Sequence, residues 1–205
     1  PGGWVADKIF GAQKSVLIGA IIITLGHYVL AMPFEKTFFL GLVLVSIGTG
    51  FLKPNISTIV GQLYKPGDIR IDAGYTIFYM SINIGSMLGF LVCGYLGEKV
   101  GWHYGFGAAG VGMTFGVIQY IWTRKSLGEA GLKPNLEVNE DASRYKSFFY
   151  IAMTLLVLII GTNFLGLWSI DAQVLNQLTV YLIVSVAVSY FIYLFFFAGL
   201  NKKEK

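Results

Sequence analysis

Charged residues are scarce in this sequence, and cysteine is almost absent. Only 13% of the 205 residues are charged, whereas a soluble domain of this size carries about 25%. Hydrophobic residues make up 55% of the chain, and the mean hydropathy is +0.67. The single cysteine, Cys93, lies in an apolar run, which excludes a disulfide framework and a cysteine metal site. Lipid is therefore the expected solvent, and the expected fold class is an all-α membrane protein.

Six apolar segments approach the roughly 20 residues that a helix needs to cross a bilayer. A polar linker over residues 127–146 separates the first four segments, within 1–126, from the last two, within 147–205. The chain opens on PGGWVADKIFG without an initiator methionine or a signal-peptide pattern, so we expect it to be part of a longer polypeptide. The predicted spans are 15–33, 38–63, 75–97, 103–123, 147–168 and 177–200.

The basic residues alternate between the loops in a way that predicts orientation. If the segment before the first span is cytoplasmic, the outside loops contain only Lys36 and Lys99. An excess of Lys and Arg marks the cytoplasmic side, so this orientation is favoured, and the linker and both ends are cytoplasmic. Because these residues lie in short loops, they do not indicate a nucleic-acid partner. The inside segments contain Lys8, Lys14, Lys65, Arg70, Arg124, Lys125, Lys133, Arg144, Lys146, Lys202, Lys203 and Lys205.

Lys53 is the one charged residue within a predicted span. All 11 acidic residues fall in loops or tails. At about 1.5 Å per residue, Lys53 lies roughly 15–18 Å from the end of its span, near the bilayer centre. A lysine at that depth costs about 2.5–3.5 kcal/mol, which implies an acidic partner, a water-filled cavity, or both. No carboxylate in these spans can be that partner, so we expect it in a part of the protein outside this sequence.

Polar and small residues form stripes on the neighbouring predicted helices. Thr49 and Ser57 share the helical face of Lys53, and Pro54 interrupts the helix beside it. The third span has a hydrogen-bonding stripe of Thr76, Tyr79, Asn83 and Ser86. The sets Ser81, Gly85, Gly89 and Ala108, Gly112, Gly116 are typical of close helix packing. Asn83 and Tyr79 could bond a neighbouring helix or the backbone of a peptide-like substrate.

Two stretches closely resemble signature regions of the proton-dependent oligopeptide transporter family, in the family's order and separation. They are GTGFLKPNIST at 48–58 and DAGYTIFYMSINIGS at 72–86. The family comprises proton-coupled symporters of di- and tripeptides within the major facilitator superfamily. The opening GGWVADKIFGAQKS resembles that superfamily's cytoplasmic loop between its second and third helices. The resemblance covers residues 1 to about 126 and implies the third to sixth helices of an N-terminal bundle, followed by two extra transmembrane helices that bacterial members insert.

The resemblance also implies residue roles. Lys53 would couple protons, pairing with a glutamate of the family's first helix, and attract the substrate carboxylate. Asn83 would hydrogen-bond the peptide backbone, Tyr79 would line a side-chain pocket, and Ile82 would add apolar surface there. The other signature residues Asn55, Phe78 and Gly85 are expected to be structural. Where the family often has two arginines before DAG, this chain has Arg70 and Ile71.

The expected function is therefore proton-coupled symport of di- and tripeptides by alternating access, in the bacterial inner membrane. The expected partners are peptides, protons, the lipid bilayer and the remaining helices of the transporter. No catalytic residue, metal or cofactor is expected, and the protein is not expected to be an enzyme. Two alternatives stay open: a related carrier of nitrate or another organic anion, and a non-transporting membrane scaffold module.

Overall fold

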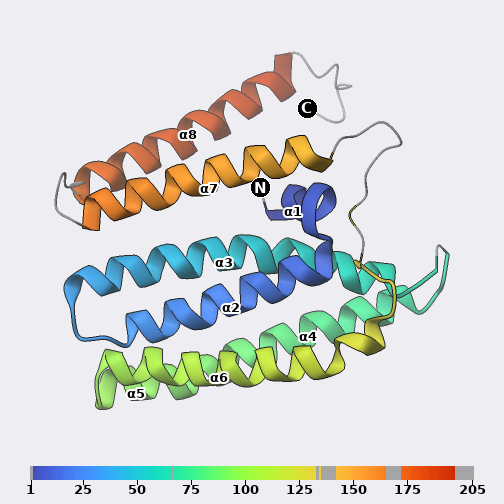
Figure 1. Ribbon diagram of the computed structural model, residues 1–205, viewed down its shortest axis with the longest axis horizontal. Coiled ribbons are helices and arrows are strands. Elements are labelled where there is room, and N and C mark those ends of the chain that lie inside the picture. Colours follow the sequence, from blue (N-terminus) through green and yellow to red (C-terminus); the bar gives the residue numbers. More distant parts are fainter. Residues whose placement is uncertain (1, 66, 133, 135–141, 165–171, 197–205) are drawn as a thin grey trace. The chain divides into compact units, whose positions relative to one another are not determined.

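A computed structural model describes residues 2–65, 67–132, 134, 142–164 and 172–196, and its described part contains helices and turns but no strand. Contacts divide the chain into two compact units, Pro1–Leu155 and Leu156–Lys205. Figure 1 shows the helices in chain order. They are α1 Gly2–Val5, η1 Ala6–Phe10, α2 Ala12–Leu30, α3 Glu35–Gln62, α4 Ile71–Gly89, η2 Phe90–Gly94, α5 Tyr95–Lys99, α6 Trp102–Thr123, η3 Arg124–Leu127, α7 Ala142–Phe164 and α8 Ala172–Phe196.

Each of the six predicted spans overlaps a long helix. The third is continuous from α4 through the π-helical turn η2 into α5, and glycines with positive φ stand at two helix starts, Gly11 before α2 and Gly101 before α6. The predicted span ends at 165–168 and 197–200, and most of the linker 127–146, lie outside the described residues. The contacts place the division between the units inside α7, after Leu155, whereas the sequence suggested a division at the linker.

Five helical segments of the described chain are long and apolar enough to cross a membrane. α6 has the length, with 22 residues, but is not among them. Its glycines and its tyrosine, tryptophan, histidine and glutamine side chains lower its hydropathy, although it was predicted as a span. The five segments are Ala12–Leu30, Glu35–Gln62, Ile71–Lys99, Tyr145–Thr162 and Gln177–Leu194.

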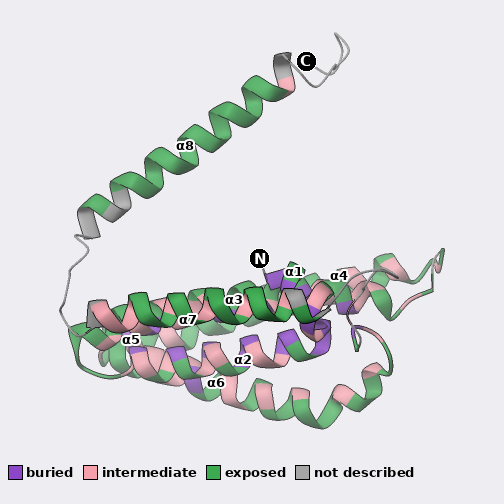
Figure 2. Ribbon diagram, turned by 45° about the horizontal axis from the view of Figure 1, so that its top comes forward, coloured by how far each residue is buried: buried purple, intermediate pink, exposed green. Residues whose placement is uncertain are grey.

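The core of the first unit is a glycine seam between α2 and α3. A Cβ atom added to Gly19 would lie 2.6 Å from the carbonyl oxygen of Gly48, and one added to Gly41 would lie 2.9 Å from that of Gly26. Only glycine permits such an approach of two backbones. Burial is accordingly concentrated on α2 and the adjoining parts of α1 and α3, as Figure 2 shows.

The other small-residue stripes, on α4 and α6, do not pack closely against another helix of the described chain. A Cβ atom added to Gly85, Gly89, Gly112 or Gly116 would meet no atom within 4 Å. The seam forms instead where both helices have glycines seven residues apart, so that the two pairs meet in register. Close packing needs small residues on both helices. A spacing of four residues between small residues on one helix does not show whether a partner helix has them too.

Aromatic side chains join the first turns of α7 to the N-terminal segment within the first unit. The ring of Trp4 makes an edge contact with Tyr145 at 5.6 Å between centroids, and Phe149 makes edge contacts with Phe10 at 5.5 Å and Phe51 at 6.2 Å. Such edge-to-face pairs stabilise beyond the apolar area that they bury. They explain why the start of α7 belongs to the unit of residues 1–155.

Candidate functional site

The site is a cavity of about 880 Å³ beside the middle of α3. Main-chain and side-chain atoms of α1, α2 and α6 complete it through Gly2, Gly3, Ile23 and Met113. Its wall is mainly apolar, with a few polar groups, which is typical of a site for a small molecule. The cavity is lined from α3 by residues that include Thr49, Lys53 and Ser57, and from α4 by Phe78, Tyr79 and Ile82.

Lys53 lies on the wall of this cavity, nine residues before the end of α3 at Gln62. At 1.5 Å per residue that is about 14 Å along the helix. Its side chain is exposed, and it makes no ion pair or hydrogen bond with any other described residue. A lysine at this depth is tolerated only beside a cavity or a counter-charge, and the cavity is present.

The sequence around Lys53 builds the wall through Pro54. Proline lacks an N–H group, so the carbonyl of Gly50 has no donor in its own helix. The backbone of Gly2 lies against that carbonyl, where a larger residue than glycine would collide with it. Asn55 holds this arrangement: it is 2% exposed, and its Nδ2 donates to the carbonyls of Phe51 at 2.6 Å and Gly2 at 3.2 Å. The structural role expected for Asn55 is confirmed.

Tyr79 and Ile82 line the same cavity from α4. They are 56% and 47% exposed in this chain, and the Tyr79 ring stacks on that of Tyr75 with centroids 6.3 Å apart. Phe78, for which we expected a structural role, lies on the cavity wall as well. The sequence feature that could have predicted this position is that Phe78 lies next to Tyr79 in a signature stretch.

Asn83 is not among the residues that line the cavity. Its Nδ2 donates to the carbonyl of Tyr79 at 2.9 Å, and Ser86 and Thr76 likewise donate to carbonyls four residues earlier. The polar stripe on α4 is therefore bonded to its own backbone rather than to a neighbouring helix of the described chain. A substrate that bonds Asn83 would have to compete with that local hydrogen bond.

The position of α4 relative to Lys53 depends on the last two turns of α3. The Tyr75 hydroxyl donates to the carbonyl of Ser57 at 3.2 Å. One turn further along α3, the same hydroxyl lies close to Gly61, and the Tyr64 ring after α3 covers Gly74. These contacts set how far Tyr79 stands from Lys53.

The loop between α3 and α4 has one ion pair among the described residues. The Arg70 guanidinium donates to both carboxylate oxygens of Asp68, at 3.1 and 2.8 Å. These hydrogen bonds lower the pKa of Asp68 to about 2. Where the family often has two arginines, this chain has Arg70, which pairs with Asp68, and Ile71, which is the first residue of α4.

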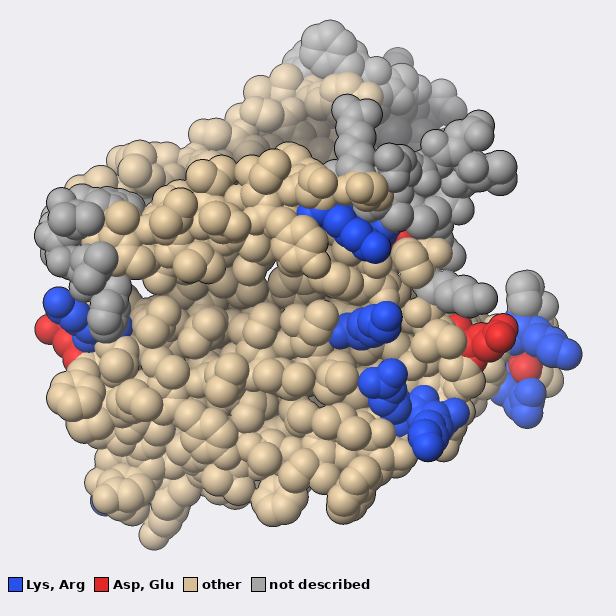
Figure 3. Space-filling model, in the orientation of Figure 1, with Lys and Arg blue, Asp and Glu red and all other residues tan. Residues whose placement is uncertain are grey.

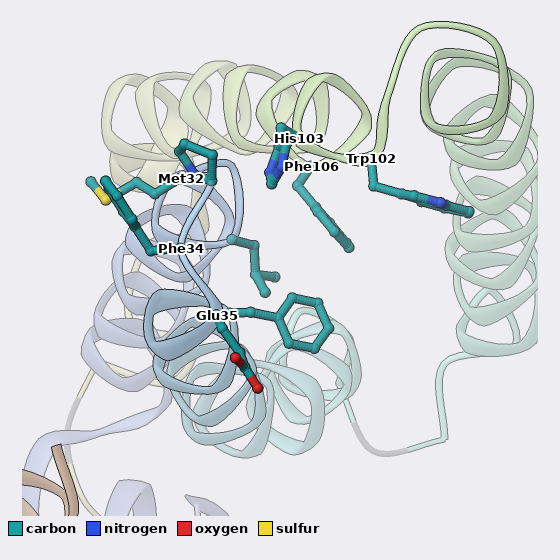
Figure 4. A pocket seen from close by; sticks show the side chains of 9 residues that line it. Met32, Phe34, Glu35, Trp102, His103 and Phe106 are labelled. Carbon is teal, nitrogen blue, oxygen red and sulfur yellow. The ribbon is translucent and has the colours of Figure 1, made fainter. Parts of the chain in front are cut away.

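A second cavity, of about 430 Å³, lies at the opposite end of α3, where the α2–α3 turn faces the start of α6. It is lined by Glu35 and His103 from different helices, and Figure 4 shows the rings of Phe106 and Trp102 on the same side as His103. Trp102 and His103 are the first two residues of α6. This cavity lies apart from the predicted site residues.

The chain matches the POT family over residues 13–143, which include both signature stretches. It is 38% identical over 200 residues to a di-/tripeptide transporter of Lactococcus lactis, covering 95% of this chain and 40% of that protein. It is 38% identical over 217 residues to the peptide transporter YePEPT of Yersinia enterocolitica, covering 100% of this chain and 42% of that protein. The chain therefore spans less than half the length of these curated relatives.

Solved structures agree with the predicted fold class, which is confirmed. A crystal structure of a peptide transporter POT in complex with sulfate superposes with a TM-score of 0.79 at 36% identity, covering 98% of this chain and 41% of that chain. A POT family transporter in complex with 5-aminolevulinic acid gives a TM-score of 0.78 at 31% identity, covering 99% and 42%. Both alignments extend into α8. With its apolar helices and bacterial relatives, the chain is a bacterial membrane protein, and it belongs to the POT family.

Proposed function

We propose that this chain is part of a proton-coupled symporter of di- and tripeptides that works by alternating access. The proposal rests on the position of Lys53. This residue lies in the middle of a membrane helix, lines a cavity, and has no ion pair with the described residues. An intramembrane ionisable group beside a cavity is a transport-site residue by default. The names of the relatives support peptides as the substrate class.

The cavity wall has the chemistry that a short peptide requires. The Lys53 ammonium attracts the C-terminal carboxylate, and a charge-assisted hydrogen bond away from bulk water is stronger than a neutral one. Tyr79 and Ile82 offer aromatic and apolar surface for a side chain. Asn83 bonds the peptide backbone after releasing the Tyr79 carbonyl.

Protons enter through the counter-charge of Lys53. A carboxylate in the remaining part of the transporter pairs with Lys53 when it is ionised, and its protonation frees the ammonium for the substrate. The charge state of the carboxylate–Lys53 pair thereby couples the binding of the proton to the binding of the peptide. The mechanism needs no metal or organic cofactor, only protons as the coupling ion.

The same proposal includes a location in the bacterial cytoplasmic membrane. The loop of residues 63–70 and the segments around η1 and η3 are basic, which favours the cytoplasmic side for these ends. Figure 3 shows that most of the viewed face has no charged side chain, as a lipid-facing surface requires. The remaining helices of the transporter close the cavity and provide the second bundle for alternating access.

Transport by the full-length protein in proteoliposomes tests the proposal. An imposed gradient, acidic outside, is expected to drive uptake of labelled dialanine, and excess unlabelled dipeptide abolishes that uptake while nitrate leaves it unchanged. Uptake of nitrate without competition by peptides would overturn the substrate class. Peptide accumulation that ignores the gradient would overturn proton coupling.

A further inference from the structure

The segment that follows α6, residues 124–132, is fastened to the start of α2 by Gln13. The Gln13 side chain is 3% exposed, and its Nε2 donates to the carbonyls of Gly128 at 3.1 Å and Ala130 at 2.8 Å. Its backbone N–H, which has no acceptor within its own helix, donates to the carbonyl of Gly131 at 2.9 Å. Residues 124–132 are called the strap below.

The strap is also hydrogen-bonded to the end of α3. The N–H of Gly131 donates to the Gln62 side-chain oxygen at 2.6 Å, and Gln62 is the last residue of α3. From α6, the Tyr120 hydroxyl donates to the backbone carbonyl of Gln13 at 3.1 Å. The start of α2 thus bonds both the strap and α6, and the strap also bonds the end of α3.

Two glycines make this junction possible. Gly131 has φ of +67°, and a Cβ atom there would lie 2.9 Å from that of Ala12. Gly11 has φ of +80°, and a Cβ atom there would lie 2.7 Å from the carbonyl oxygen of Leu132. A side chain at either position would strain the backbone and collide with it.

The junction is connected to the substrate cavity through the last turns of α3. Pro54 removes one backbone hydrogen bond of α3, which divides the helix into a part held by the glycine seam and a part, residues 54–62, that ends at the strap. That second part holds α4 through the hydrogen bond from Tyr75 to Ser57. The strap therefore fixes the part of α3 that sets the distance from Lys53 to the wall on α4.

We propose that Gln13 and Gln62 are positioning residues, which set the width of the substrate cavity through the strap without touching the substrate. This inference rests on the proposed function. The hydrogen bonds from the Gln13 and Gln62 side chains to the strap are called the clasp. When the clasp is broken, residues 54–62 and α4 move together relative to Lys53, and the affinity for a peptide falls.

The test uses the full-length transporter with Gln13→Met and Gln62→Met, which keep the side-chain length and remove the hydrogen bonds. Gln62 is exposed, so its variant disturbs the fold less than that of buried Gln13, and Gln119→Met on the exposed face of α6 is the matched control. We expect the KM for dialanine to rise about five-fold in both clasp variants, with the maximal rate per inserted molecule within about two-fold of the parent, because the loss of one or two hydrogen bonds changes an equilibrium by this amount. A merely structural role would lower the amount of inserted protein and leave KM unchanged.

A second measurement does not depend on transport. Trypsin cleavage after Lys125, in the strap, is expected to be about five-fold faster in both clasp variants than in the parent and the control, because local opening exposes the bond. If the parent takes up no peptide, the proposed function fails, and this cleavage rate still decides whether the clasp exists. Faster cleavage with an unchanged KM overturns the positioning role, and unchanged cleavage overturns the clasp itself.

Discussion

The hydroxyl of Tyr75 donates a hydrogen bond to the backbone carbonyl of Ser57 at 3.2 Å. Ser57 lies one helical turn after Lys53 on α3, and Tyr75 lies one turn before Tyr79 on α4. Lys53 and Tyr79, which both line the cavity, are therefore each one turn away from a hydrogen bond that joins their helices. This relationship allows changes outside the cavity to alter its shape.

Removal of that hydroxyl tests the relationship. In the full-length transporter, Tyr75→Phe is expected to lower stability by about 0.5–1.5 kcal/mol, the net value of one hydrogen bond, and to raise the KM for dialanine. Thermal unfolding and initial uptake rates measure the two effects. Tyr104→Phe, on an exposed ring at the start of α6, is the control. Equal behaviour of the two variants would contradict the joining role of Tyr75.

The glycine seam predicts that two alanine substitutions of the same type have different effects. Gly48→Ala places a Cβ atom 2.7 Å from the Gly19 carbonyl oxygen, and separating the helices costs about 1–3 kcal/mol. Gly112→Ala on α6 meets no atom of the described chain and gains up to about 1 kcal/mol of helix propensity. Melting temperatures of the two purified proteins measure the difference. Similar melting temperatures would show that the α2–α3 backbones can separate without loss.

Two asparagines are expected to differ in what they support. Asn55→Ala leaves the buried carbonyl of Gly2 without its donor, so stability falls by about 1–3 kcal/mol. Asn83→Ala removes only a hydrogen bond to its own helix, so stability changes little while the KM for peptide rises about two- to ten-fold. Thermal unfolding and uptake, measured on both variants, separate the roles. A stability loss at Asn83 as large as that at Asn55 would place it in the fold rather than in the site.

The ion pair of Asp68 and Arg70 predicts a pH range without titration. The pKa of Asp68 in the folded protein, about 2, is below its ordinary value, so the pair's contribution is present above the ordinary carboxyl pKa and is lost only as the pH falls toward 2. Asp68→Asn should therefore leave the pH profile of uptake between about 4.5 and 7.5 unchanged. A shift of the profile's midpoint in this variant would make Asp68 part of the proton pathway.

The membrane helices and the depth of Lys53 could be predicted because hydropathy and charge are local properties. A lysine amid apolar residues shows its unusual position in the sequence itself, and its cavity follows from the energy of burying it. Tyr79 and Ile82 were predicted from the family's signature stretch, and the structure adds Phe78 to the same wall.

The packing partners could not be predicted, because they depend on two distant segments at once. The pairs Gly19–Gly48 and Gly26–Gly41 need a register between α2 and α3 that neither helix specifies alone. Gln13 resembled an ordinary polar residue at a span's edge, and its partners lie more than 100 residues away in the strap. In the polar stripe of α4, the question was whether the side chains bond another helix or a ligand, whereas in the described chain they bond their own backbone.

Gradient-driven uptake by a Lys53→Gln variant tests the central claim most directly. The assay uses the full-length protein in proteoliposomes, with Lys65→Gln, in the loop after α3, as the control. In the Lys53→Gln variant, uptake of dialanine against its gradient is expected to fall below about a tenth of the parent's rate, because a charge-assisted contact is lost. The control keeps the parent's rate. Proton-driven accumulation by Lys53→Gln at the parent's rate would contradict the account.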